Sequence, residues 1–366
     1  MHPRGNVGRL REAQFALVLP EALGPDALAA LRGALEHGID VDGTQVALRV
    51  SVGQAAPDDA ATPEQWLRQA DAAGRSARAA GLHVATHGPE LVREAADRLT
   101  LLSDLRHALD GDASVGGRLR VHYQGKHRAC DGVLVAAEAL VRWEHPTSGM
   151  LPPARFLQVA EDAGLMPALT AFVLKTALQD LPTFRAVRPD WQTAVNLGQH
   201  DLDPGLPGRV TELLAGAGLP ASALRLEVTE DVVMSDADRM LAILQDVADL
   251  GVGLSLDDYG TGRASLAHLR QLPVDELKID RSFVARLQDG QVDTLLVAST
   301  VQLAHALGLR TVAEGAEDHA TVSALAALGC DLVQGYALSR PLPLHDLLLL
   351  AVPELLAVPE LRTCSS

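Results

Sequence analysis

Short apolar runs with β-strand character recur along most of this chain, and segments with helical apolar spacing lie between them. The strand-like runs cover residues 119–123, 133–141, 193–197, 224–228, 253–256, 276–279, 311–313 and 332–334. Helical spacing is found at residues 154–161, 167–178, 236–250 and 294–307. Alternating strands and helices predict an α/β fold with a parallel sheet covered by helices, and about eight strands favour closure into a barrel.

Composition limits the classes of protein to which the chain can belong. It has 366 residues, of which 48% are hydrophobic and 3% aromatic, enough for two domains with large aliphatic cores. The formal net charge of -16 disfavours binding of bulk nucleic acid, although a small anionic ligand held by metal ions stays compatible with it. The three cysteines, Cys130, Cys330 and Cys364, lack zinc or disulfide spacing and predict reduced cytosolic thiols.

No apolar signal segment opens the chain, and its longest apolar run, residues 347–352, is too short to cross a bilayer. We therefore expect a cytoplasmic chain that makes no membrane contact of its own. We expect four parts: a small first domain at 1–88, a linker helix at 89–110, the barrel at 111–345 and a tail at 346–366. Within the first domain we expect strands at 15–19 and 46–52, a helix at 25–35, and a second helix that Thr62 caps before Pro63.

The carboxyl ends of barrel strands carry the active site, and several of the predicted strands end in polar residues. Asp257 and Asp258 follow the run 253–256. In an extended strand their side chains would point to opposite faces, whereas a turn at the strand end would bring both to one site. The alternative is a plain turn, because Asp-Asp-Tyr-Gly-Thr-Gly is favourable turn chemistry.

Two other acids and an amide follow the same logic. Glu227 lies on the face opposite to Leu224 and Leu226, so inside a barrel it needs a partner or a metal ion. Glu230 either supports a loop or opposes the dipole of a helix amino terminus. Asn196 carries an oxygen that suits hard cations, and a hydrogen-bonded core amide is the alternative.

Glu138 and Arg142 belong to one run. Glu138 faces either solvent or a metal ion. Arg142, near the strand end, has the planar guanidinium that binds phosphate with two hydrogen bonds. The alternative for Arg142 is a surface ion pair with Glu144, the commoner fate of a single arginine.

Lys278 lies between two apolar residues of a strand and points away from them. Beside cations it would orient a water molecule or stabilise charge on phosphate. The alternative is a salt bridge with Asp280 or Asp258.

Glu314 and Glu317 flank Gly315, and we expect one as a ligand and the other as a structural partner. Gln334 suits a base or phosphate contact. Chance would not place polar groups at so many successive strand ends, so we predict one site built from several strands. Four or more oxygen ligands suit Mg²⁺ or Mn²⁺ better than zinc, which predicts an enzyme that acts on phosphate esters.

These motifs resemble those of the EAL-domain cyclic-di-GMP phosphodiesterases over residues 101–343. The matching segments are Val121-His122-Tyr123-Gln124, Glu138-Ala139-Leu140-Val141-Arg142-Trp143, Glu144-His145-Pro146, Asn196, Glu227-x-Thr229-Glu230, Asp257-Asp258-Tyr259-Gly260-Thr261-Gly262, Lys278-Ile279-Asp280, Glu314-Gly315 and Gln334-Gly335-Tyr336. The resemblance implies a modified TIM (β/α)8 barrel that hydrolyses cyclic-di-GMP to linear pGpG with two Mg²⁺ or Mn²⁺ ions.

The resemblance also implies a role for each residue. Lys278 would lie beside the attacking water, and Glu230 would brace the loop after Asp258. The first cation would be held by Glu138, Asn196, Glu227 and Asp257, and the second by Asp257, Asp258 and Glu314. Substrate contacts would come from Gln124, Leu140, Arg142, Gln334 and Glu317.

Two positions depart from the family pattern. Gly125 stands where proline is usual and is followed by the basic Lys126-His127-Arg128, so we expect an altered loop over the substrate. Tyr259 stands where phenylalanine is usual. Neither departure removes a metal ligand.

The first domain resembles the later part of a GGDEF (diguanylate cyclase) domain through Val50-Ser51-Val52-Gly53 and Ala70-Asp71. Arg11-Glu12-Ala13-Gln14-Phe15 replaces the family signature, so the glycine pair that lets the backbone approach GTP phosphates is missing, and so is the catalytic acid. The resemblance implies a degenerate, partial domain with an α+β fold and a structural or regulatory role.

The complete set of acids favours an enzyme over the alternatives, which are a cyclic-di-GMP receptor without turnover and an interaction module regulated by a partner. The family commonly couples dimerisation to the loop after Asp258, so the resemblance also implies a homodimer formed through the EAL domain.

Overall fold

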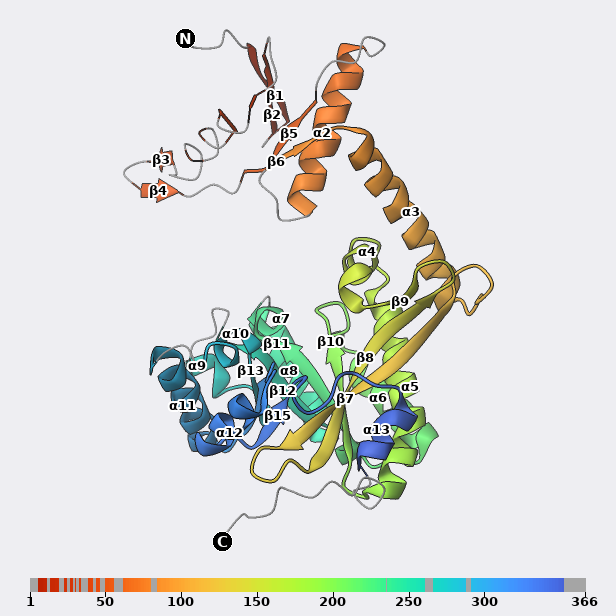
Figure 1. Ribbon diagram of the computed structural model, residues 1–366, viewed down its shortest axis with the longest axis vertical. Coiled ribbons are helices and arrows are strands. Elements are labelled where there is room, and N and C mark those ends of the chain that lie inside the picture. Colours follow the sequence, from red (N-terminus) through yellow and green to blue (C-terminus); the bar gives the residue numbers. More distant parts are fainter. Residues whose placement is uncertain are drawn as a thin grey trace. The chain divides into compact units, whose positions relative to one another are not determined.

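The computed structural model describes residues 6–351 apart from 12–13, 20–22, 25–26, 29, 31–32, 34–38, 42–43, 47–49, 56–61, 80–83, 235, 261–265 and 288–290. The chain forms two compact units, Met1–Leu101 and Leu102–Ser366 (Figure 1). Helix α3, Pro89–Leu109, lies where a helix is predicted at 89–110, and the boundary between the two units falls within it. Among the described residues, no helix combines the length and apolar character needed to span a membrane.

In the described part of the first unit, the strands form three two-stranded sheets. Strands β1 (Asn6–Arg11) and β2 (Gln14–Val18) pair antiparallel, as do β3 (Ile39–Val41) and β4 (Thr44–Val46). Strands β5 (Val52–Gln54) and β6 (Val84–Thr86) pair parallel, and helix α2 (Pro63–Ala79) connects them and packs on both.

Several expectations for this unit can be compared with the structure. Thr62 does cap α2: its Oγ1 accepts from the Gln65 amide at 3.4 Å while Gln65 Oε1 accepts from the Thr62 amide at 2.7 Å. The predicted strand at 15–19 corresponds to β2. A single strand at 46–52 is wrong, because Val46 ends β4 and Val52 begins β5 of a different sheet. The helix expected at 25–35 lies largely outside the described residues.

The second unit contains a closed barrel of eight strands. The strands are β7 (Arg118–Arg128), β8 (Leu134–His145), β10 (Gln192–Leu197), β11 (Leu224–Thr229), β12 (Gly253–Tyr259), β13 (Glu276–Ile279), β14 (Arg310–Glu314) and β15 (Leu332–Gln334). Strands β10 to β15 follow each other in order, β15 pairs with β7, and pairing of β8 with β10 closes the ring. The short β9 (Gly149–Leu151) extends β8 at the rim. Each predicted strand of the barrel is present.

One strand departs from the predicted parallel sheet. β7 runs antiparallel to both its neighbours, β8 and β15. The physical reason is the connection between β7 and β8, which is only residues 129–133 long: a link this short permits a hairpin, whereas a parallel pair needs a longer crossover.

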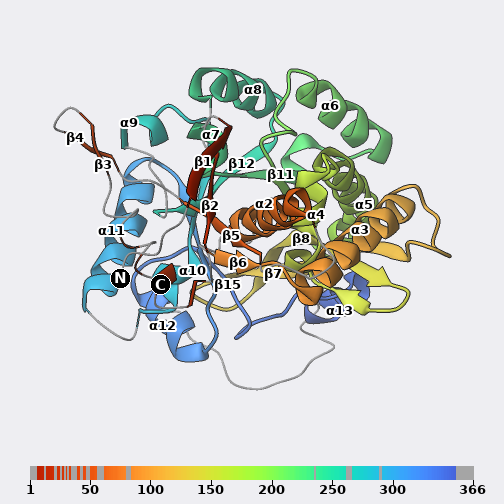
Figure 2. The same ribbon diagram turned by 90° about the horizontal axis from the view of Figure 1, so that it is seen from above.

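Helices surround the barrel, as Figure 2 shows for α5, α6, α8, α11 and α12. The helices of this unit are α4 (Leu157–Asp162), α5 (Met166–Val187), α6 (Leu206–Ala217), α7 (Glu230–Met234), α8 (Ala237–Asp249), α9 (Leu266–Leu269), α10 (Arg281–Val284), α11 (Gln291–Ala306), α12 (His319–Ala327) and α13 (Leu344–Ala351). Two single-turn 3₁₀ helices, η1 (Pro153–Arg155) and η2 (Ala221–Ala223), precede α4 and β11.

Alternation along the strands separates an apolar outer layer from a charged interior. In β11, Leu224, Leu226 and Val228 are fully buried on the face opposite to Arg225 and Glu227. The same period places Leu277 and Ile279 of β13 opposite Glu276 and Lys278. The barrel interior therefore holds ionised side chains that must satisfy one another.

Candidate active site

Lys278 lies at the centre of a ring of carboxylates at the carboxyl end of the parallel strands. Its Nζ is 2.6 Å from Glu227 Oε2, 2.9 Å from Asp257 Oδ2 and 2.6 Å from Glu314 Oε1, and Glu138 Oε2 is 3.6 Å away. Burial disfavours the ammonium, but these four acids outweigh it and hold the pKa of Lys278 well above its usual range. Lys278 is thus a charged lysine. Of the two partners considered from sequence, Asp280 caps α10, and the charge of Lys278 acts on Asp258 by attraction.

Glu138 is held by two side-chain amides. Asn196 Nδ2 donates to its Oε1 at 2.6 Å, and Gln334 Nε2 donates to its Oε2 at 2.7 Å. Gln334 Nε2 also lies 3.1 Å from Gln124 Oε1 of β7. Asn196 is exposed rather than buried, so the alternative of a core amide is wrong. The contacts bring strands β7, β8, β10 and β15 into one site.

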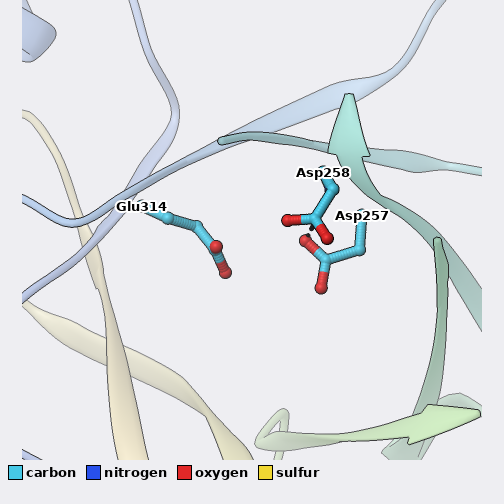
Figure 3. Close-up of side chains that lie close together, drawn as sticks. All are labelled: Asp257, Asp258 and Glu314. Carbon is cyan, nitrogen blue, oxygen red and sulfur yellow. Dashed lines mark hydrogen bonds between the residues drawn. The ribbon is translucent and has the colours of Figure 1, made fainter. Parts of the chain in front are cut away.

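The adjacent carboxylates converge, as a turn at the strand end predicts. Asp258 has a φ of 56°, a left-handed conformation that is uncommon outside glycine, and its amide donates to Asp257 Oδ1 at 2.8 Å. Carboxylate oxygens of Asp257, Asp258 and Glu314 lie within 4.8 Å of one another. Figure 3 shows the two aspartates side by side at the end of β12, with Glu314 of β14 pointing toward them.

Burial, aided by neighbouring acids, raises the pKa of two of these carboxyl groups. Burial raises the pKa of Glu314 to about 8, with Asp257 and Glu138 adding to the effect against the attraction of Lys278. Burial, together with the charges of Asp257 and Asp280, also raises the pKa of Asp258. A divalent cation would relieve this repulsion.

A second ionic layer lies below the first and was not expected from sequence. Lys126 Nζ is 2.6 Å from Glu227 Oε1 and 2.9 Å from Glu276 Oε1. Glu276 also accepts from Arg310 Nη2 at 2.7 Å, and Arg225 Nε is 3.6 Å away. The expected altered loop at 125–128 is wrong: these residues belong to β7, and Lys126 points into the barrel because it alternates with the outer-layer Tyr123 and Gly125.

The remaining predicted residues lie around the site. Arg142 is half-buried on β8 and donates from Nη1 to its own Val141 carbonyl at 2.7 Å, while Glu144 pairs with Arg120 instead. Burial lowers the pKa of Arg142.

Leu140 is half-buried on β8, and Glu317 is exposed after β14. Glu230 is buried as the first residue of α7; most of the loop that it is expected to brace, 261–265, lies outside the described residues.

The donors present fit a divalent metal centre. The set consists of carboxylate and amide oxygens, which Mg²⁺ and Mn²⁺ prefer. Gln334 Oε1 is buried without a hydrogen-bond partner in the described structure, so an oxygen at the rim of the site stays free for a ligand or water. The cluster of Asp257, Asp258 and Glu314 is therefore an acidic group able to hold a metal ion.

Comparisons with known proteins agree with this geometry. The EAL domain model matches residues 103–341. The chain is 37% identical over 350 residues to the bifunctional diguanylate cyclase/cyclic di-GMP phosphodiesterase MucR of Pseudomonas aeruginosa, covering 93% of this chain and 50% of that protein. It is 38% identical over 317 residues to the cyclic di-GMP phosphodiesterase NbdA of the same organism, covering 86% and 40%. The chain thus spans half or less of the length of these two relatives.

Solved structures give the same relationship. The structure described as PaMucR phosphodiesterase in complex with c-di-GMP is 41% identical, with a TM-score of 0.64 over 68% of this chain and 99% of that one. The EAL enzyme Bd1971, bound to cAMP and cyclic-di-GMP, is 28% identical, with a TM-score of 0.66 over 71% of this chain and 70% of that one. The chain belongs to the EAL domain family.

Proposed function

We propose that this chain hydrolyses one phosphodiester bond of cyclic-di-GMP and releases linear pGpG. The observation that carries the proposal is the convergence of Glu138, Glu227, Asp257 and Glu314 on Lys278. Relatives named as cyclic di-GMP phosphodiesterases and a related structure in complex with c-di-GMP support the choice of substrate. Retention of every expected acid supports turnover over mere binding.

Two Mg²⁺ or Mn²⁺ ions are the expected cofactors. Glu138, Asn196, Glu227 and Asp257 would hold one ion, and Asp257, Asp258 and Glu314 the other. When bound, such ions lower the pKa of a water molecule and neutralise charge on the phosphate.

The side chains of the chain itself supply the rest of the mechanism. Water adds to phosphorus, the bond from phosphorus to the ribose 3′ oxygen breaks, and that oxygen gains a proton. Lys278, kept charged by its acids, donates hydrogen bonds that orient the water and stabilise charge on phosphate. Gln124, Leu140, Arg142, Gln334 and Glu317 are the proposed substrate contacts, and Glu230 supports the loop after Asp258.

We also propose that residues 1–88 are a degenerate, partial GGDEF domain, joined by a helix at 89–110 to the phosphodiesterase domain at 111–345 and a tail at 346–366. The alignment with a bifunctional diguanylate cyclase covers 93% of this chain and therefore reaches well before residue 103, which supports that origin. A cytoplasmic location and a homodimer formed through the EAL domain complete the proposal.

The decisive experiment is a product assay on wild type beside Glu138→Ala. Purified protein, cyclic-di-GMP and Mg²⁺ or Mn²⁺ should yield pGpG, and the variant should lose metal binding and turnover together. Calorimetry with cyclic-di-GMP, with and without metal, distinguishes an enzyme from a receptor. Tight binding by wild type without any pGpG would refute the enzyme and leave the receptor.

A further inference from the structure

Lys126 is a buried cation that serves two glutamates at once. Its side chain is 1% exposed, and both partners, Glu227 and Glu276, are fully buried. Burial opposes the charge, but the two glutamates outweigh it and raise the pKa of Lys126. Ionised side chains so deep in a barrel are costly unless each is paired. An apolar side chain at position 126 would pack in the barrel without this cost, so the presence of a lysine there needs another explanation.

The contacts divide the two oxygens of Glu227 between two lysines. Oε1 accepts from Lys126 at 2.6 Å, on the side of the amino-terminal ends of the parallel strands, and Oε2 accepts from Lys278 at 2.6 Å, on the side of the candidate active site. The last torsion of a glutamate is broad, so the carboxylate would otherwise rotate. With Oε1 occupied, Glu227 presents a single oxygen to the site.

We propose that Lys126 is a positioning residue for Glu227, an inference that rests on the proposed phosphodiesterase activity. Lys126 does not reach the reacting groups. It fixes the plane of the Glu227 carboxylate, so that Oε2 stays available to a cation instead of both oxygens turning toward Lys278. Partners of this kind orient metal ligands, and their loss typically weakens metal binding or activity by roughly 10- to 100-fold.

The second partner of Lys126, Glu276, has cationic partners of its own. Glu276 accepts from Arg310 Nε and Nη2 at 3.0 and 2.7 Å and thereby faces Lys126 with its other oxygen. Arg225 lies beside this glutamate and pairs with Asp275. Strands β11 and β13 therefore supply the two carboxylates that contact Lys126, and Arg310 of β14 binds the other oxygen of Glu276.

The test compares wild type with three variants. Lys126→Met removes the contact to Glu227, and Lys126→Met/Glu276→Gln removes it while keeping the buried charge balanced, in case the single variant fails to fold. Arg310→Met is the matched control, because it loosens the same Glu276 without touching Glu227. The measurements are Mn²⁺ calorimetry without substrate, kcat and KM for cyclic-di-GMP, and thermal unfolding without metal.

We expect the folded Lys126 variants to bind Mn²⁺ about 10- to 100-fold more weakly and to lose kcat with little change in KM. Arg310→Met should bind Mn²⁺ like wild type. Unchanged or tighter Mn²⁺ binding by the folded double variant would overturn the proposal, and so would an equal loss in Arg310→Met. If wild type forms no pGpG, the proposed function fails, while the Mn²⁺ affinities still decide whether Lys126 positions Glu227.

Discussion

Asn196 donates a hydrogen bond to Glu138 between the paired strands β10 and β8, with 2.6 Å from Nδ2 to Oε1. The other oxygen of Glu138 accepts from Gln334. Neutral amides therefore hold this carboxylate on both sides without cancelling its charge. Asn196→Leu should lower pGpG formation by roughly 10- to 100-fold with little loss of stability, since Asn196 is exposed. Initial rates and unfolding midpoints check this.

Gln334→Leu provides a second arm of the same experiment. Because both amides act on one carboxylate, the double variant should lose less activity than the product of the two single losses. Wild-type turnover in Asn196→Leu would contradict the role assigned to this pair.

Lys278→Met should destabilise the metal-free protein. The substitution leaves four carboxylates facing one another in the barrel, and removing one partner of a buried ion pair typically costs about 3–5 kcal/mol. Added Mg²⁺ should raise the unfolding temperature of this variant more than that of wild type, while turnover stays lost. Lys175→Met, an exposed lysine on α5, is the control and should behave as wild type. Equal Mg²⁺ responses in all three proteins would argue against a shared site.

Stability should fall in acid partly because of His127. Burial lowers the pKa of this histidine to about 4, from an unfolded value of roughly 6.5. The unfolded chain therefore binds the extra proton first, so the contribution is complete above pH 6.5 and is lost as the pH falls toward 4. At pH 5 the loss is about 2 kcal/mol. Denaturant unfolding of wild type and His127→Gln at pH 8 and pH 5 measures it, and parallel losses in the two proteins would refute it.

Gly53→Ala should disrupt the first unit. An added Cβ would lie 1.9 Å from the Ala70 carbonyl oxygen and 2.2 Å from the Gly74 nitrogen, so β5 and α2 would have to separate. Overpacking of this kind costs about 1–3 kcal/mol. Hydrogen exchange in α2 should accelerate, whereas Gly8→Ala, with no atom within 4 Å of the new Cβ, should leave it unchanged.

The parts of the barrel that could be predicted from sequence are those in which a local pattern of residues determines the local structure. Leu224 and Leu226, two residues apart, identify one face of a strand and place Glu227 on the other, and the glycines after Asp257-Asp258 indicate a turn. Convergence on one site then follows from the parallel strands, whose carboxyl ends meet at one edge. Proposed metal and substrate roles for these residues stay predictions.

Other features depend on partners that are distant in the sequence. From sequence, Lys126 is predicted to belong to a basic loop. Its partners, Glu227 and Glu276, lie more than 100 residues away, so no local pattern indicates that it forms ion pairs with them. Arg142 donates to the carbonyl of Val141, and Glu144 accepts from Arg120 of β7, which is 24 residues away in the sequence. The reversal of β7 did have a local signal, the short turn-forming stretch before the next strand.

The reversed direction of β7 has a consequence for insertions and deletions. Gln124 and Lys126 meet the interior at two depths only because β7 keeps its register with β8 from Arg118 to Lys126. Removing a single residue between them would exchange the two faces of the strand beyond that point. His127 would then enter the ionic core and the ammonium would lie against the aliphatic helices, so this strand should tolerate substitution far better than any change in its length.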